Sequence, residues 1–152
     1  MVPCLMGRGR GGYTEKQTGY KDSGGHKVTD PGAIWVAERY IDMGYESVFR
    51  QQHPERGKQF DLTVKTANDQ SYVKNIEVKK VTTLNTSNIA KNIKYASRQI
   101  SSGDTVALFF EGRKNTNENR DFISKGIAEA RRKGYIKGPV EVWFPDKTKI
   151  VY

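Results

Sequence analysis

An aspartate and a Glu-x-Lys triplet occupy positions in this sequence where strand residues are expected. Asp61 lies between two apolar residues, although aspartate is uncommon in strands. Glu77 and Lys79 alternate with apolar residues further along, so both side chains should project from one face of a strand. If the two segments form a hairpin centred on Asp69, Asp61 stands opposite Glu77.

Directly opposed carboxylates repel each other, and a cation between them removes that cost. Two oxygen ligands completed by water suit Mg²⁺ (or Mn²⁺), which can activate water and neutralise charge on a phosphodiester. Lys79 would then hold or deprotonate the attacking water, or stabilise the transition state. The alternative is an exposed charge ladder in which Glu77 pairs with Lys65 or Lys79.

A glutamate and two histidines stand near this pair in the chain. Glu38 borders the apolar stripe of an expected helix, where a carboxylate needs a partner unless it reaches solvent. His26 comes shortly before that helix and could assist proton transfer or orient a substrate. His53 falls in a hydrophilic loop, and neither histidine has a metal-ligand spacing.

The most cationic part of the chain overlaps the same segment. Residues 74–98 contain six lysines and arginines against Glu77 only, a local charge of +5. Cations beside a metal site match a substrate that carries phosphates, whereas a solvated basic helix face is the alternative. We expect four of these cations to steer a phosphate backbone, with a glutamine facing the sheet edge beside them: Lys80, Lys91, Lys94, Arg98 and Gln99.

The apolar pattern predicts the helices and strands that would position these side chains. Asp30 can cap a helix that ends at Gly44, and a second helix is expected from a cap at residues 85–87 to Gly103. A third helix is expected at 117–133, and strands at 45–52, 60–65, 72–81, 105–110, 140–144 and 148–152. The order α-β-β-β-α-β-α-β-β predicts an α/β fold with a sheet covered by helices.

Composition narrows the class of protein further. A chain of 152 residues can bury one core, and 26 basic against 17 acidic residues leave a net charge of +9 that suits a polyanionic partner. The longest purely apolar run, 106–110, is far shorter than the ~20 residues that span a bilayer, so no transmembrane helix is expected. Residues 1–10 lack the order of a signal peptide, and the single cysteine, Cys4, excludes an internal disulfide.

The beginning of the chain differs from the rest. Eight of the fifteen glycines lie between Gly7 and Gly32, and no apolar periodicity accompanies them. We therefore interpret residues 1–29 as a flexible glycine-rich tail or linker and residues 30–152 as one domain.

The pattern of acidic residues and elements resembles the PD-(D/E)xK nuclease superfamily. Its restriction-endonuclease-like core runs α-β-β-β-α-β, the order predicted from residue 30 to 110, to which a C-terminal helix and strands are added here. Asp61 matches the metal-binding aspartate, and Glu77 and Lys79 match the Glu-x-Lys of that family. The resemblance implies that Val78 lends a backbone carbonyl to the metal.

Two further positions match more loosely, and one departs from the pattern. Glu38 matches the acidic residue often found on the first helix of the family, and Gln99 resembles the polar residue on the second, which we place with the substrate-binding residues. Phe60 stands where a proline is expected before the aspartate, a departure that many members share.

Within that superfamily, residues 25–112 are similar to the C-terminal toxin domains of contact-dependent growth inhibition proteins and related polymorphic toxins. The resemblance implies a metal-dependent nuclease, secreted as part of a larger effector, that cuts tRNA in the cytoplasm of a neighbouring bacterium. It also implies an immunity protein, which should present acidic residues to the +5 stretch. A DNA endonuclease in toxin, repair or restriction service is the first alternative, and a non-catalytic nucleic-acid-binding module is the second.

Overall fold

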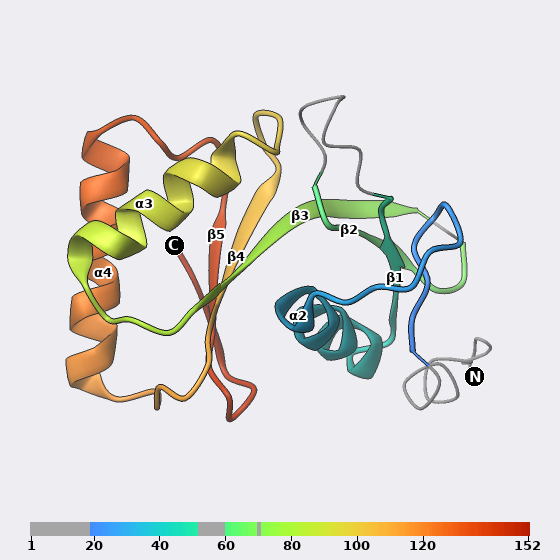
Figure 1. The fold of residues 1–152 in the computed structure, drawn as a ribbon, viewed down its shortest axis with the longest axis horizontal. Coiled ribbons are helices and arrows are strands. Elements are labelled where there is room, and N and C mark those ends of the chain that lie inside the picture. The colour runs from blue at the N-terminus through green and yellow to red at the C-terminus, as the bar shows by residue number, and fades with distance from the viewer. Residues whose placement is uncertain (1–18, 52–59, 70) are drawn as a thin grey trace.

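The predicted order of helices and strands is confirmed in the computed structural model, which describes residues 19–51, 60–69 and 71–152 (Figure 1). The elements are α2 (Pro31–Asp42), β1 (Tyr45–Phe49), β2 (Leu62–Thr66), β3 (Tyr72–Val81), α3 (Thr86–Ser97), β4 (Thr105–Phe110), α4 (Asn117–Arg132), β5 (Val140–Trp143) and β6 (Lys149–Val151). Several elements are shorter than predicted: β1 ends at Phe49, α3 ends at Ser97, and β2 begins only at Leu62, so Asp61 lies just before the strand and not within it. Cys4 and His53 lie outside the described residues.

All six strands belong to one mixed sheet, in the order β1-β2-β3-β4-β5-β6. The first three strands and the last two pair antiparallel, while β3, β4 and β5 are parallel. Parallel neighbours require crossover connections, which α3 and α4 provide. Every residue of β4 is buried, as expected for a central parallel strand covered on both faces.

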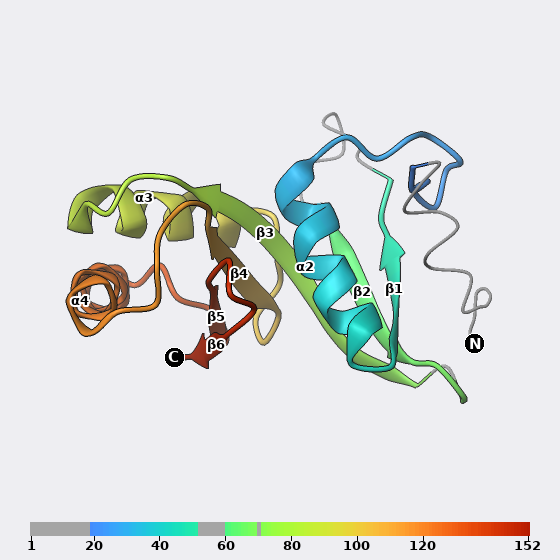
Figure 2. The same ribbon diagram turned by 90° about the horizontal axis from the view of Figure 1, so that it is seen from below.

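The helices cover the two faces of the sheet unequally (Figures 1 and 2). One apolar cluster joins α2 to Ile76 and Val78 of β3, and the other joins α3 and α4 to Val81 at the end of the same strand. Since side chains alternate along a strand, Glu77 and Lys79 lie on the face of Val81, opposite to α2.

The start and end of α2 follow local chemistry. Asp30 Oδ1 accepts hydrogen bonds from the backbone N–H groups of Gly32, at 2.9 Å, and Ala33, at 3.4 Å, so the predicted cap is confirmed. Gly44 has a φ of 94°, a conformation that favours glycine and that turns the chain from α2 into β1.

The structure corrects the predicted extent of the flexible tail. Residues 1–18 lie outside the described residues, but from Gly19 onward the chain packs on the domain. Tyr20 is 4% exposed, its ring centroid lies 5.1 Å from that of Phe49, and a bridge between Lys21 and Lys27 closes a turn. A buried aromatic side chain thus anchors a segment whose glycine content suggests flexibility.

Of the helices in the described part of the chain, none has the length and apolar character needed to cross a lipid bilayer.

Candidate functional site

The hairpin of β2 and β3 brings Asp61 opposite Glu77, as predicted. The register pairs Leu62 with Ile76, and Asp61 is the residue immediately before β2. The backbone N–H of Asp61 donates to the Ile76 carbonyl at 3.0 Å, so this bend just before β2 stays attached to β3. The two carboxyl groups meet directly, because the Asp61 and Glu77 side chains share a hydrogen bond.

Direct contacts connect this pair to its neighbours. Asp61 Oδ2 accepts a hydrogen bond from the backbone N–H of Val78 at 2.8 Å, and Lys79 Nζ lies 3.6 Å from Glu77 Oε2. The Glu77 side chain is only 7% exposed, whereas that of Lys79 is 33% exposed. The second oxygen of Glu77, Oε1, is buried and accepts no hydrogen bond from the described part of the protein. Because Glu77 also shares a side-chain hydrogen bond with Asp61, the pair needs a proton, or a cation in its place, between its oxygens.

Both carboxyl groups are harder to ionise than usual. Burial raises the pKa of Glu77 to about 9, and the neighbouring Asp61 charge adds to this shift while Lys79 opposes it. Burial also raises the pKa of Asp61, against the effect of the Val78 N–H. Two buried carboxylates this close bind a proton together, or a cation in its place.

A third acidic residue near Asp61 comes from the helix cap. The charge of Asp30 contributes to raising the pKa of Asp61, and both side chains line one cavity. The start of α2 approaches β3 closely, since a Cβ on Gly32 would lie 3.3 Å from the Lys80 Cβ. The sequence indicated Asp30 only as a helix cap, and no local signal predicts this second neighbour.

Glu38 lies on α2 and contacts Tyr20 and Arg39. It is 13% exposed on α2, so the predicted position at the border of the apolar stripe is confirmed, but α2 covers the opposite face of β3 from Glu77. The Tyr20 hydroxyl donates to Glu38 Oε2 at 3.1 Å, and Arg39 Nη2 lies 3.9 Å from Oε1. No group of three or more acidic, histidine or cysteine side chains within the described ranges is placed to hold a metal ion.

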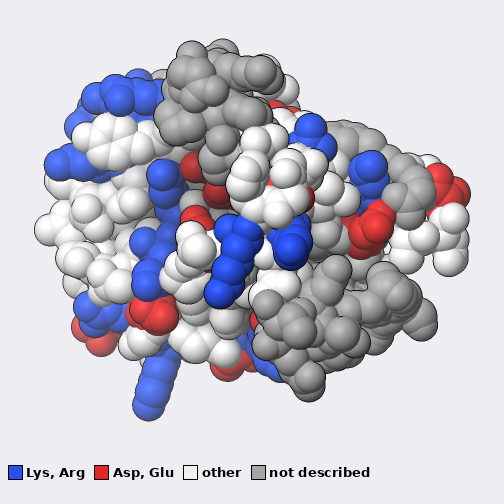
Figure 3. Space-filling view, turned by 45° about the vertical axis from the view of Figure 1, so that its right-hand side comes forward, with Lys and Arg blue, Asp and Glu red and all other residues white. Residues whose placement is uncertain are grey.

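The predicted substrate-binding cations are divided between two faces. Lys80 lies on the α2 side of β3, where its Nζ is 3.4 Å from Glu111 Oε1. The other three cations belong to α3 and its C-terminal end. Lys91 is exposed. Lys94 Nζ lies 5.5 Å from the Tyr135 ring centroid, and Arg98 Cζ lies 5.1 Å from the Tyr95 ring centroid. Gln99 is half-buried just beyond α3. Figure 3 shows acidic atoms near the centre of one face with lysine and arginine side chains on either side.

His26 lies near the site without touching the carboxylate pair. Its ring Nδ1 is 3.7 Å from Asp22 Oδ1, and the side chain is 68% exposed. His26 lines the same cavity as Asp61, a position from which it can contact a ligand held there.

The donor set fits a divalent cation that keeps several waters. Asp61 and Glu77 supply carboxylate oxygens, and Oε1 of Glu77 is the buried acceptor without a donor. The Val78 N–H points to Asp61, and in a strand the carbonyl of a residue points to the same side as its N–H. Two carboxylates and one carbonyl are a typical incomplete set for Mg²⁺.

Replacing Glu77 with glutamine is expected to raise the free energy of unfolding when no metal ion is bound. Below pH ~4.5 Glu77 is protonated in the folded and in the unfolded protein. Between this pH and about pH 9 it keeps its proton only in the folded protein, so the free energy of unfolding falls as pH rises through this window. Glutamine removes this loss, and we expect a gain of about 1–3 kcal/mol at pH 8, or roughly 3–10 °C in Tm.

Thermal unfolding of both chains in EDTA at pH 4 and pH 8 measures this effect. The gain should be small at pH 4 and large at pH 8. A Tm for Glu77→Gln at pH 8 equal to or below that of the unmodified chain would contradict the view that the Glu77 carboxylate destabilises the fold.

The fold and the site together define a class: an α/β protein with a mixed sheet that carries a buried carboxylate pair beside a lysine. Comparisons with protein-family models, curated proteins and solved structures found no match for this chain.

Proposed function

We propose that this protein is a metal-dependent nuclease that hydrolyses phosphodiester bonds, with tRNA as its substrate. The observation that carries the proposal is the hydrogen-bonded meeting of the half-buried Asp61 with the buried Glu77, whose Oε2 lies 3.6 Å from the Lys79 ammonium nitrogen. Such a strained pair costs stability, so a role in binding a cation accounts for its presence.

Each residue of the site has a role in this reaction. Asp61, Glu77 and the Val78 carbonyl would hold Mg²⁺ or Mn²⁺, which supplies charge neutralisation at the phosphate and an activated water when bound. Lys79 lies beside Glu77 yet remains one-third exposed, so its ammonium group can reach the attacking water or a phosphate oxygen. The low exposure of Glu77 strengthens these electrostatic interactions.

Biological context enters the proposal through the resemblance described above. The chain would act as a toxin domain in the cytoplasm of a neighbouring bacterium, after delivery within a larger effector. An immunity protein with an acidic surface would oppose the cations of α3, of which Lys91 and Arg98 are exposed.

Incubation of the purified chain with total tRNA and with plasmid DNA, in Mg²⁺ or in EDTA, tests the function. We expect fragments of tRNA in Mg²⁺, intact tRNA in EDTA and intact plasmid in both. Cleavage of the plasmid would favour the DNA endonuclease, and cleavage in EDTA would exclude the metal-dependent mechanism. Intact nucleic acid in every condition would favour the non-catalytic binding module.

The cations at α3 should control affinity through phosphate contacts. Replacing Lys91, Lys94 and Arg98 together with alanine is expected to weaken tRNA binding and to make it less sensitive to salt. Each lost phosphate contact lowers the slope of log K against log salt by about 0.7–0.9, so the triple variant should lose about 2–3 units of slope. Replacing Arg131, Arg132 and Lys133 at the end of α4 is the matched control, and an unchanged slope in the first variant would contradict the prediction.

A further inference from the structure

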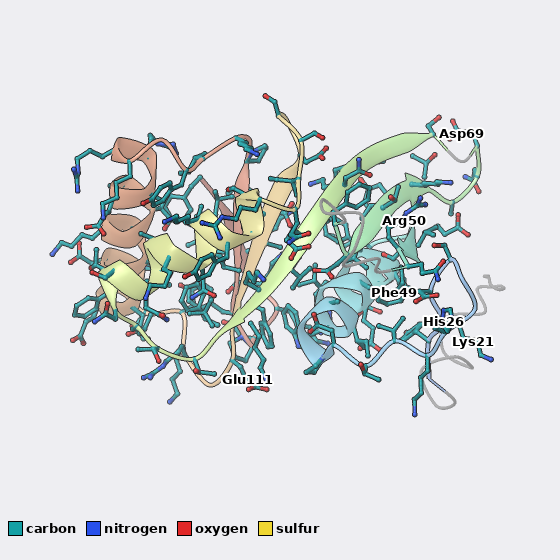
Figure 4. All side chains as sticks on the ribbon, turned by 45° about the horizontal axis from the view of Figure 1, so that its top comes forward. Lys21, His26, Phe49, Arg50, Asp69 and Glu111 are labelled. Atoms are coloured by element: carbon teal, nitrogen blue, oxygen red, sulfur yellow. The ribbon has the colours of Figure 1, made fainter. Side chains whose placement is uncertain are left out.

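A cavity of about 390 Å³ opens beside Asp61 at the edge of the sheet formed by β1 and β2. Its walls are the turn that precedes α2, the first turn of α2 and the end of β1. The apolar residues in these walls are Val28, Ala33 and Phe49. Figure 4 shows Phe49 and Arg50 on the β1 side, with His26 close by in the turn. The volume and the mixture of apolar and polar groups are typical of pockets that bind a small organic group.

The charged groups of the cavity have both signs. Asp22, Asp30 and Asp61 contribute carboxylates, and Lys27 and Arg50 contribute cations. Oδ1 of Asp22 accepts hydrogen bonds within its own turn, and Oδ1 of Asp30 caps α2, so a ligand donor would meet the other oxygen of each. Three carboxylates against two cations make the cavity unfavourable for an isolated phosphate.

A nucleobase matches this combination of groups better than other parts of a nucleic acid. Its flat face suits an apolar wall and the plane of an arginine, and its amino groups donate to carboxylates. A base reaches such a cavity only when it is unpaired, because a duplex keeps its bases stacked inside.

The position of Asp61 connects the cavity with the candidate catalytic pair. Its side chain accepts the Val78 N–H beside Glu77 and also lines the cavity. A phosphate at the carboxylate pair therefore has the cavity as its immediate neighbour, where an adjoining nucleotide would lie.

We propose that this cavity binds the base of an unpaired nucleotide next to the phosphate at Asp61, so that the protein selects single-stranded or looped RNA over duplex RNA. This inference rests on the proposed nuclease function and defines the substrate of that same site.

Binding of an end-labelled RNA hairpin and of a fully paired RNA duplex of equal length, measured by fluorescence anisotropy in EDTA, tests the proposal. We expect the full-length protein to bind the hairpin at least about tenfold more tightly than the duplex. Thr29 is exposed and lines the cavity, so Thr29→Trp should fill it without disturbing the core and should remove the preference. Ala128→Trp, at an exposed position of α4, is the matched control and should retain it.

Equal affinity of the unmodified protein for the two RNAs would overturn the proposal, as would a preference that persists in Thr29→Trp. Cleavage of the same RNAs in Mg²⁺ separates this inference from the proposed function. A hairpin preference without cleavage in Mg²⁺ would support the cavity and reject the nuclease, whereas equal cleavage of hairpin and duplex would do the reverse. Failure to bind either RNA would reject both.

Discussion

Replacing Asp61 or Lys79 with alanine is expected to reduce RNA cleavage by about three orders of magnitude while leaving the protein folded. Asp61→Ala removes one of two carboxylates that hold the cation, and Lys79→Ala removes the ammonium group 3.6 Å from Glu77. Neither side chain belongs to an apolar cluster of the core. In Asp61→Ala the Val78 N–H and the Glu77 carboxyl each lose a partner, but the desolvated Asp61 charge also disappears, so the effects on stability oppose each other.

Initial rates of tRNA cleavage in saturating Mg²⁺, together with Tm, measure both parts of this prediction. Lys65→Ala is the matched control, because Lys65 lies on the same strand as the hairpin site, paired with Tyr72 near the turn and outside the proposed site. Its rate should stay close to that of the unmodified chain. A large fall in Tm for Lys79→Ala, or cleavage that persists in either site variant, would show that these residues serve the fold and not the reaction.

Replacing Glu141 with alanine is expected to cause the largest loss of stability, about 3–5 kcal/mol, equivalent to roughly 6–20 °C in Tm. Glu141 is fully buried in β5 and accepts hydrogen bonds from three donors. Lys74 Nζ donates at 2.7 Å, Trp143 Nε1 at 3.1 Å, and the Tyr40 hydroxyl donates to the same oxygen as Lys74. Burial and the charge of Glu141 raise the pKa of Tyr40 well above its usual range, so Tyr40 remains a donor. Alanine would leave the buried Tyr40 and Trp143 donors without this acceptor and would remove the carboxylate partner of Lys74.

Urea or thermal unfolding of Glu141→Ala provides the measurement. Glu129→Ala is the control, since Glu129 makes a partly exposed surface pair with Lys133 at the end of α4, 3.5 Å apart, and should change stability by less than about 0.5 kcal/mol. Well below its Tm, Glu141→Ala should cleave RNA at the rate of the unmodified chain. The hydrogen bonds and ion pairs of Glu141 are with Tyr40, Lys74, Trp143 and Lys149, and none of these residues belongs to the proposed site. A stability change as small as that of the control would show that the buried network contributes little.

Local pattern predicted the elements that carry the site. The alternation around Glu77 and the spacing to Asp61 determine which face each side chain takes and which residues meet across the hairpin. Both depend only on the period of a strand and the length of a turn. The caps at Asp30 and Asn85 were likewise predictable, because a capping side chain bonds to backbone groups two or three residues away.

Contacts between distant segments were not predictable in the same way. The helical spacing of Glu38 shows that it borders an apolar stripe, but not which face of the sheet α2 covers. The same limit applies to Asp30, which lies near Asp61, and to Glu141, which lies 101 residues from Tyr40 in the chain.

By itself, the sequence determined the order of the elements and the opposition of Asp61 and Glu77, since these follow from short-range periodicity. The tertiary structure alone decided that Asp30 approaches Asp61, that Tyr20 anchors part of the glycine-rich segment, and that a cavity opens beside Asp61. The physical reason is that these features depend on how helices pack on the two faces of the sheet, and that packing is the sum of many weak contacts between residues far apart in the chain.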